Sequence, residues 1–318
     1  RYKAVHVSKI VPCNWKVAQE AFMEAYHVLS THPQLLAGIG DTNSQYDVWG
    51  NISRAITPNG TPSPHLEWEP SEQDRLDAMT NRYIDEDPAM VLPDAMTGRE
   101  LLGQASRVQL APLVPGATEL TDSELLDSFY YTVFPNFHPW GAYNKITYRF
   151  RPHGNDPHHC IMEVMYLNPY RGKRPPPCEI HWLAPDEDFT HAPELGFLSR
   201  VFNQDAFNFG AVQAGLRAGV HENLVFANYQ ETKIRHFHTL LERYIANRTT
   251  SNFEAVLSAA QDVAHAVRET GYQIQKSGDY AGEPKYQLAP LYGSFAIEYF
   301  FMLGEFESAK DMLAWTLS

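Results

Sequence analysis

The chain contains the stretch NWKVAQEAFMEAYH at residues 14–27, and a second histidine follows at His32. The spacing of the apolar residues predicts a helix over residues 15–31, which carries His27. Histidine is the commonest metal ligand among side chains, because a neutral imidazole offers a nitrogen lone pair. His27 and His32 are therefore candidate ligands of one metal ion.

The spacing of the two histidines places a condition on that helix. Five residues of an ideal helix turn by about 500°, so the two side chains would point about 140° apart. They can share a metal ion only where the helix tightens, bulges or ends between them. Pro33 disfavours helical geometry at the residue before it, so we expect a break near Thr31.

Two carboxylates complete the pattern. Glu24 lies three residues before His27, on the same face of the predicted helix, from which it can hydrogen-bond the non-ligating nitrogen of that imidazole. Asp205 lies in the run FNQDAFNF at residues 202–209, where aromatic neighbours predict a buried setting that an anion tolerates only with a partner. Asp205 is thus the candidate third ligand, ahead of Asp262 and Asp279. Histidines at this spacing also occur without metal, merely hydrogen-bonded in a core or on a surface.

These motifs resemble one family. The NWK run, the E-x-Y-H-x-x-x-x-H spacing and the later N-Q-D are similar to the catalytic domain of the Rieske non-haem iron oxygenases, the large subunits of aromatic-ring-hydroxylating dioxygenases. The resemblance runs from about residue 2 to about residue 244 and is weak over residues 50–113. It implies that His27, His32 and Asp205 hold a mononuclear Fe(II). It also implies that Glu24 is the acidic bridge for electron transfer from a Rieske cluster.

The resemblance further implies a fold and partners. The family fold is α+β with a helix-grip architecture, in which a curved antiparallel sheet surrounds a long helix. The family activates O₂ to hydroxylate, and commonly to cis-dihydroxylate, an organic substrate. Electrons come from a Rieske [2Fe–2S] centre, supplied by a ferredoxin and reductase, and the cluster belongs to a neighbouring subunit of a ring-shaped trimer.

The Rieske centre itself has no complete ligand set in this sequence. It requires two cysteines and two histidines, which the family supplies as C-x-H and C-x-x-H pairs. The chain has only Cys13, Cys160 and Cys178, of which Cys178 alone has C-x-x-H spacing, to His181, without the C-x-H pair that the centre also needs, and the chain starts at Arg1. We therefore expect a catalytic domain over residues 1–276 without an N-terminal Rieske domain, and a helical C-terminal extension of uncertain role over residues 277–318.

Composition and charge limit the classes of binding partner that the chain can have. The 318 residues carry a formal net charge of −13, which argues against nucleic acid or an anionic membrane as the main partner. No secretory signal opens the chain, and the sequence shows no run of about 18 uncharged apolar residues. Three scattered cysteines suit free thiols in a reducing cytoplasm.

The remaining pattern predicts a sheet-rich centre flanked by helices. Alternating apolar residues predict strands at residues 2–10, 129–137, 142–151, 160–167 and 178–183. Helical spacing predicts helices at residues 71–83, 123–131, 193–207, 228–247, 253–275 and 293–317.

Aromatic and sulfur-containing side chains near the proposed ligands are candidates for an apolar substrate cavity. Met23 and Phe202 come first, because each lies within about a turn of a proposed ligand. The other candidates are Phe22, Phe134 and Phe207. Each is equally well explained as ordinary core, where aromatic residues are abundant.

Two other functions use the same residues. A zinc hydrolase with a His/His/Asp ligand set would attack an ester or amide with metal-bound water and would need no O₂. A non-enzymatic helix-grip module would bind a lipid or aromatic ligand in the same cavity, and would bind it equally well without His27 and His32.

Overall fold

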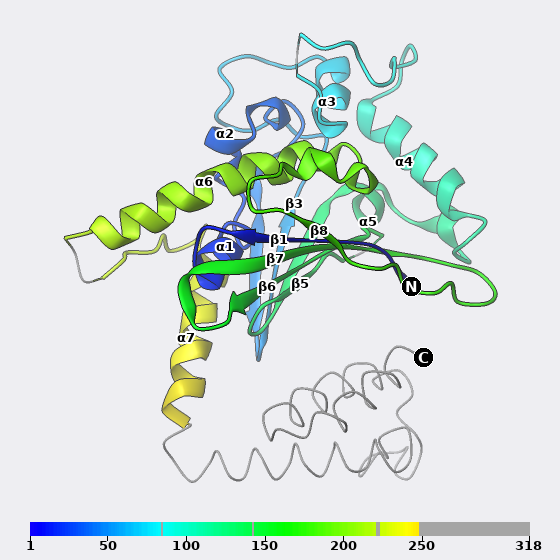
Figure 1. Cartoon of the computed structure of the whole chain (residues 1–318). Helices are drawn as coiled ribbons and strands as arrows, with labels where there is room; N and C mark the ends of the chain where they lie inside the picture. The colour runs from blue at the N-terminus through cyan, green and yellow to red at the C-terminus, as the bar shows by residue number, and fades with distance from the viewer. Residues whose placement is uncertain (84, 142, 221–222, 248–318) are drawn as a thin grey trace, which may run out of the picture. The chain divides into compact units, whose positions relative to one another are not determined.

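The computed structural model of this chain describes residues 1–83, 85–141, 143–220 and 223–247 (Figure 1). The chain divides into two units, Arg1–Leu240 and Leu241–Ser318. The predicted helices at residues 253–275 and 293–317, and the domain boundary predicted at residue 276, lie outside the described residues. Within the described ranges, no helix combines the length and apolarity that crossing a membrane requires.

A single eight-stranded sheet forms the centre of the first unit, with strand order β2-β3-β4-β5-β6-β7-β1-β8. Neighbouring strands run antiparallel, except that β1 and β8 are parallel. The strands are β1 (Tyr2–Val11), β2 (Gln45–Trp49), β3 (Ile52–Thr57), β4 (Ser128–Val133), β5 (Phe137–Pro139), β6 (Ile146–His153), β7 (Asp156–Asn168) and β8 (His181–Leu183). The predicted antiparallel α+β class is therefore confirmed.

Helices of very different length accompany the sheet. The α-helices are α1 (Trp15–Glu20), α2 (Val28–Thr31), α3 (Glu72–Met79), α4 (Gly98–Leu110), α5 (Asp122–Leu126), α6 (Leu198–Ala218) and α7 (Thr232–Asn247). Short 3₁₀ turns are η1 (Pro33–Leu35), η2 (Asp41–Asn43), η3 (Ala117–Glu119), η4 (Phe189–His191) and η5 (Pro193–Leu195).

Local sequence explains the helix starts, and also two errors of prediction. Ser71 caps α3, which lies within the predicted helix over residues 71–83, in a reciprocal capping box with Asp74. Thr97 and Glu100 make the same box at the start of α4, which the prediction missed. The helix expected over residues 123–131 was wrong beyond Leu126, because the aromatic and β-branched residues from Ser128 onward pair as strand β4.

The helix predicted over residues 15–31 is also wrong as one element, because it is two short helices. Asn14 caps α1 by accepting the amide of Lys16, and α1 ends at Glu20. A non-helical turn follows, in which the Glu24 carboxylate accepts the backbone amide of His27 at 3.0 Å. A side chain that bonds the backbone in this way offers it an alternative to the helical ladder. The helix predicted from residue 15 is therefore interrupted before His27, and α2 also ends after Thr31, where the break was predicted.

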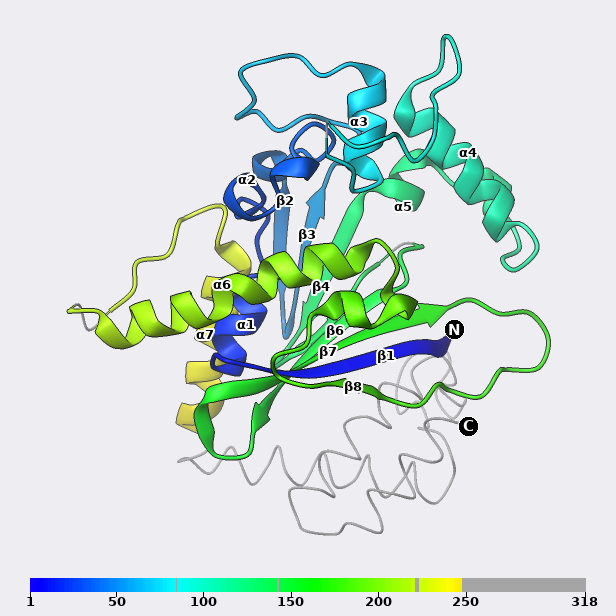
Figure 2. The same ribbon diagram turned by 45° about the horizontal axis from the view of Figure 1, so that its top comes forward.

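The main core lies between the sheet and the helices on one of its faces. Helix α1 contacts β6, β7 and α6, and α6 also contacts β1, so both helices cover the same face (Figure 2). Residues that alternate along β6 and β7 enter this core with Phe202 and Phe209 of α6: Tyr148, Phe150, Met162 and Val164. Each such side chain contributes about 1.5–3 kcal/mol by leaving water. The core thus holds α6, the helix that carries Asp205, against the sheet.

A charged cluster lies on the opposite face of the same strands. Glu163 alternates with the core residues of β7, so its side chain points away from the core, and it is 1% exposed. It accepts from Arg149 at 2.5 Å, from Arg151 at 2.9 Å and from His6 at 3.2 Å. Although burial opposes ionisation, these partners hold the pKa of Glu163 well below its usual range.

We predict that Glu163→Gln destabilises the protein at neutral pH by about 2 kcal/mol, because it removes the anion that three cationic or polar partners share. A depressed pKa stabilises the fold above the ordinary carboxyl pKa, and this contribution is lost as pH falls. The difference between wild type and variant in chemical denaturation should therefore shrink below about pH 4. The exposed Glu67→Gln should change stability little, and equal effects of the two substitutions would contradict the role of the cluster.

Candidate metal centre

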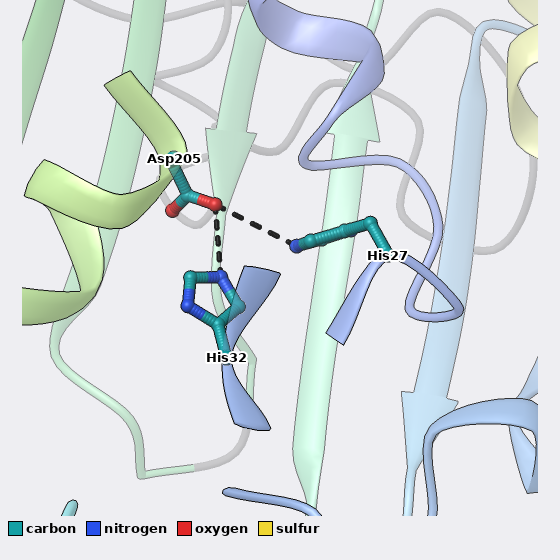
Figure 3. Close-up of side chains that lie close together, drawn as sticks. All are labelled: His27, His32 and Asp205. Carbon is teal, nitrogen blue, oxygen red and sulfur yellow. Dashed lines mark hydrogen bonds and ion pairs between the residues drawn. The ribbon is translucent and has the colours of Figure 1, made fainter. Parts of the chain in front are cut away.

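Three side chains from two distant segments converge beside the core. His27 and His32 flank α2 as its N-cap and C-cap residues, and Asp205 projects from α6. Asp205 Oδ1 lies 2.9 Å from His32 Nε2 and 3.6 Å from His27 Nε2. Figure 3 shows both imidazoles directed at the same carboxylate oxygen. The structure therefore brings together the three residues that the sequence proposed as ligands.

The short α2 solves the spacing problem of the two histidines. His27 precedes the helix and His32 ends it with a non-helical φ of −128°, so neither is bound by the 140° separation of an ideal helix. Their ring centroids lie 5.3 Å apart. Breaks at both ends of one turn, rather than a bulge within a long helix, turn the two rings toward a common point.

Each imidazole is held through its Nδ1 atom. Glu24 Oε1 lies 2.7 Å from Nδ1 of His27, as its position one turn earlier predicted, and Gln204 Oε1 lies 2.9 Å from Nδ1 of His32. Both Nε2 atoms are left facing Asp205. This is the arrangement of metal-binding histidines, in which a hydrogen bond at one ring nitrogen orients the other toward the ion.

Burial and charge favour a cation at this point. Asp205 is 4% exposed, His32 is 2% exposed and Glu24 is buried, so two carboxylates lie beside two imidazoles away from water. Burial disfavours the protonated form of His27, but the Glu24 carboxylate outweighs burial and raises the pKa of His27 to about 9. Buried anionic groups of this kind need a compensating positive charge.

The distances fit a metal ion. Two atoms bound to one ion at about 2.1 Å lie about 3–4 Å apart. The ligand atoms of His27, His32 and Asp205 all lie within 4.8 Å of one another, and among the described residues they are the group with such spacing. Small side-chain movements would bring them to coordination distance. Two imidazoles and one carboxylate are the ligand set of mononuclear non-haem iron sites.

The predicted cavity residues differ in position. Phe22, Met23 and Phe202 are buried or partly buried in the core next to the ligand-bearing segments. Phe134 lies elsewhere, packed against Phe237 of α7 at 5.8 Å. Phe207 is a correction: it is 86% exposed, because two residues of helix turn it about 200° away from the face of Asp205.

Two residues at the site were missed by sequence reasoning. Tyr148 of β6 packs between Phe22 at 4.6 Å and Phe202 at 5.8 Å. Burial raises the pKa of Tyr148 well above its ordinary value, and the nearby Asp205 carboxylate adds to the rise. Gln204 stood within the N-Q-D run, but only its contact with His32 reveals what it does. No sequence signal connected Tyr148 to the site.

The chain matches the family described as "Ring hydroxylating alpha subunit (catalytic domain)" over residues 1–247. A search of curated proteins found no match.

Solved structures with similarity to the chain include several oxygenases. The quaternary ammonium Rieske monooxygenase CntA in complex with an inhibitor is 12% identical with a TM-score of 0.43, and the match covers 76% of this chain and 49% of that one. A naphthalene 1,2-dioxygenase mutant bound to phenanthrene is 15% identical with a TM-score of 0.40, covering 75% and 53%. Dicamba monooxygenase is 10% identical with a TM-score of 0.37, covering 77% and 61%. The chain thus spans about half the length of the first of these proteins.

We predict that Asp205→Ala lowers Fe(II) affinity by at least about 100-fold, because loss of a ligand should exceed the effect of losing an outer partner. Metal analysis after anaerobic reconstitution measures this, and thermal unfolding checks that the fold remains. The exposed Asp186→Ala serves as the matched control and should retain wild-type metal content. Full iron occupancy in Asp205→Ala would contradict the assignment.

Proposed function

The chain belongs to the ring-hydroxylating alpha-subunit family through its catalytic domain, and we propose that it is the iron-binding part of a Rieske-type oxygenase. In this proposal His27, His32 and Asp205 hold Fe(II), and the enzyme uses O₂ to hydroxylate an aromatic or other apolar substrate. The observation that carries the proposal is the convergence of these three residues inside the span that matches the family.

The ligand set suits this chemistry. Three protein ligands leave positions open on Fe(II), and the bound ion would supply the activation of O₂ there. Asp205 offsets one unit of the metal charge, while the two imidazoles bind as neutral ligands. Their Nδ1 partners, Glu24 and Gln204, keep both rings oriented without occupying the Nε2 atoms.

Glu24 has a second role in the proposal. Its Oε1 contacts Nδ1 of His27, its Oε2 accepts the His27 amide, and its side chain is buried. Glu24 lies in the turn between α1 and α2, and its side chain is therefore hydrogen-bonded to both the ring and the backbone of a proposed iron ligand. We assign it as the bridge by which an electron from a Rieske [2Fe–2S] centre reaches the iron.

The apolar core beside the ligands supports the proposed class of substrate. Phe22, Tyr148 and Phe202 form connected aromatic contacts on the sheet side of Asp205. Such walls favour an apolar or aromatic ring and exclude water, which limits side reactions. We therefore propose Phe22, Met23 and Phe202 as substrate contacts, and leave out the exposed Phe207 and the distant Phe134.

We propose a Rieske centre from another domain or subunit, reduced by a ferredoxin and reductase, and assembly as a homotrimer in which a neighbouring subunit approaches Glu24. The cysteines Cys13, Cys160 and Cys178 are free thiols, which suits an enzyme of the reducing cytoplasm.

We expect Glu24→Gln to retain Fe(II) within a few-fold but to lose turnover when the complete electron-transfer chain is supplied. The amide oxygen can still accept from Nδ1 of His27, whereas the carboxylate of the proposed bridge is gone. Metal content and single-turnover product formation separate the two effects. Glu20→Gln, in the same segment but bonded to His238, should behave as wild type. Wild-type turnover in Glu24→Gln would remove Glu24 from the electron route.

Dependence on O₂ tests the reaction class. We expect the reconstituted protein with its donor chain to consume O₂ together with an apolar substrate, to retain Fe(II), and to release no product under anaerobic conditions. Ester or amide cleavage without O₂, together with a preference for zinc, would instead support a hydrolase. Undiminished ligand affinity in a metal-free His27→Ala/His32→Ala variant that shows no turnover would support a binding module.

A further inference from the structure

A chain of three side-chain amides, the buried Asn81 and Gln34 and the partly buried Gln204, leads from a backbone carbonyl to His32. Asn81 Nδ2 donates to the Phe197 carbonyl oxygen at 2.8 Å, and Gln34 Nε2 donates to Asn81 Oδ1 at 2.9 Å. Gln34 Nε2 also donates to Gln204 Oε1 at 2.8 Å, and Gln204 Nε2 donates back to Gln34 Oε1 at 3.1 Å. Gln204 Oε1 then contacts His32 Nδ1 at 2.9 Å.

The carbonyl at the start of this chain fixes its direction. A backbone carbonyl can only accept, so Asn81 must turn its NH₂ group toward Phe197 and its oxygen toward Gln34. Gln34 must then present its NH₂ group to Asn81 and to Gln204, and its oxygen to the Gln204 NH₂ group. Each amide orientation follows from the one before, and the atom that faces His32 has to be the oxygen of Gln204.

We infer that Gln204 is a positioning residue that holds His32 as its Nδ1–H tautomer and so presents Nε2 to the metal. The inference rests on the proposed iron site. Because Gln204 Oε1 is an acceptor, Nδ1 of His32 must donate to it, so the neutral ring in the metal-bound protein would have its lone pair on Nε2, free for coordination. That atom faces Asp205 at 2.9 Å, which is the direction a ligand needs.

The two imidazoles thus have different partners. His27 donates to a carboxylate, whereas His32 donates to a neutral amide that two further amides hold in place. A carboxylate at both positions would add another buried negative charge beside Asp205, with its desolvation cost. The neutral chain orients His32 without that charge, and it ties the ligand to Phe197, directly before α6.

A purely structural role has to be distinguished. Gln204 Nε2 also donates to the Tyr83 hydroxyl at 3.2 Å, so its removal could simply loosen the loop that carries Tyr83. The experiment therefore uses one variant that removes every polar contact of the side chain, Gln204→Met, and one that keeps the acceptor oxygen toward His32 and Gln34 but loses the NH₂ group that donates to Gln34 and Tyr83, Gln204→Glu. Gln213→Met is the control, because Gln213 lies on the same helix about 13 Å further along and accepts the Asn14 amide instead.

Fe(II) affinity, measured anaerobically by competition with a chelator, is the first readout. We expect Gln204→Met to bind Fe(II) about 10–100-fold more weakly, as is typical when a ligand loses its outer hydrogen bond. Gln204→Glu and Gln213→Met should stay within a few-fold of wild type. Equal weakening in Gln204→Met and Gln204→Glu would overturn the inference in favour of the structural role, and wild-type affinity in Gln204→Met would overturn it outright.

The second readout is the ring N–H proton of His32 in the Zn(II)-loaded protein, observed by NMR with ¹⁵N-labelled histidine. We expect a hydrogen-bonded Nδ1–H resonance that is protected from exchange in wild type and Gln213→Met, and lost or strongly shifted in Gln204→Met. A protonated Nε2 in the wild-type complex would contradict the inference. Absence of metal binding by the wild-type protein would instead overturn the proposed function, so the two failures are distinguishable.

Discussion

The Asp205 carboxylate, buried between two imidazoles, is the interaction on which the rest of the site depends. An ionised carboxylate removed from water is costly unless it is paired or binds a cation. Here it contacts Nε2 of His32 at 2.9 Å and of His27 at 3.6 Å, and Glu24 adds a second buried anion. The aromatic packing around α6 holds Asp205 in place, and the break in the N-terminal helix lets His27 and His32 approach it.

Fold and site meet at two helices, the single turn α2 and the long α6. The single turn of α2 carries a histidine at each end, and α6 carries Asp205 on the face that packs against the sheet. The core beneath α6 is apolar, whereas Glu163 and its arginines lie on the other face of the same strands. The sheet therefore separates the charge that stabilises the fold from the charge of the proposed metal site.

Local patterns predicted the site better than they predicted the elements that carry it. Residue types and spacing made His27, His32 and Glu24 candidates, the aromatic neighbours of Asp205 made it a fourth, and the family resemblance joined them into one proposed site, whose three proposed ligands the structure brings together. The continuity of the helix before His32 was misjudged because a side-chain bond from Glu24 to the backbone competes with helix propensity. Residues that reach the site only through tertiary contacts, such as Gln34 and Tyr148, could not be predicted from a single sequence, because no local pattern distinguishes them.

Helix α6 carries Phe202, Gln204 and Asp205 within four consecutive positions, which are a proposed wall residue, a ligand partner and a ligand. One residue inserted upstream in this helix would rotate all three by about 100° and advance them by about 1.5 Å. The connection between β7 and β8 has no such coupling, because it is an irregular and largely exposed segment. We therefore expect insertions and deletions to be tolerated in that connection but not in the first two turns of α6. The positions of the proposed site residues depend on the rotation of this helix and not on the overall length of the chain.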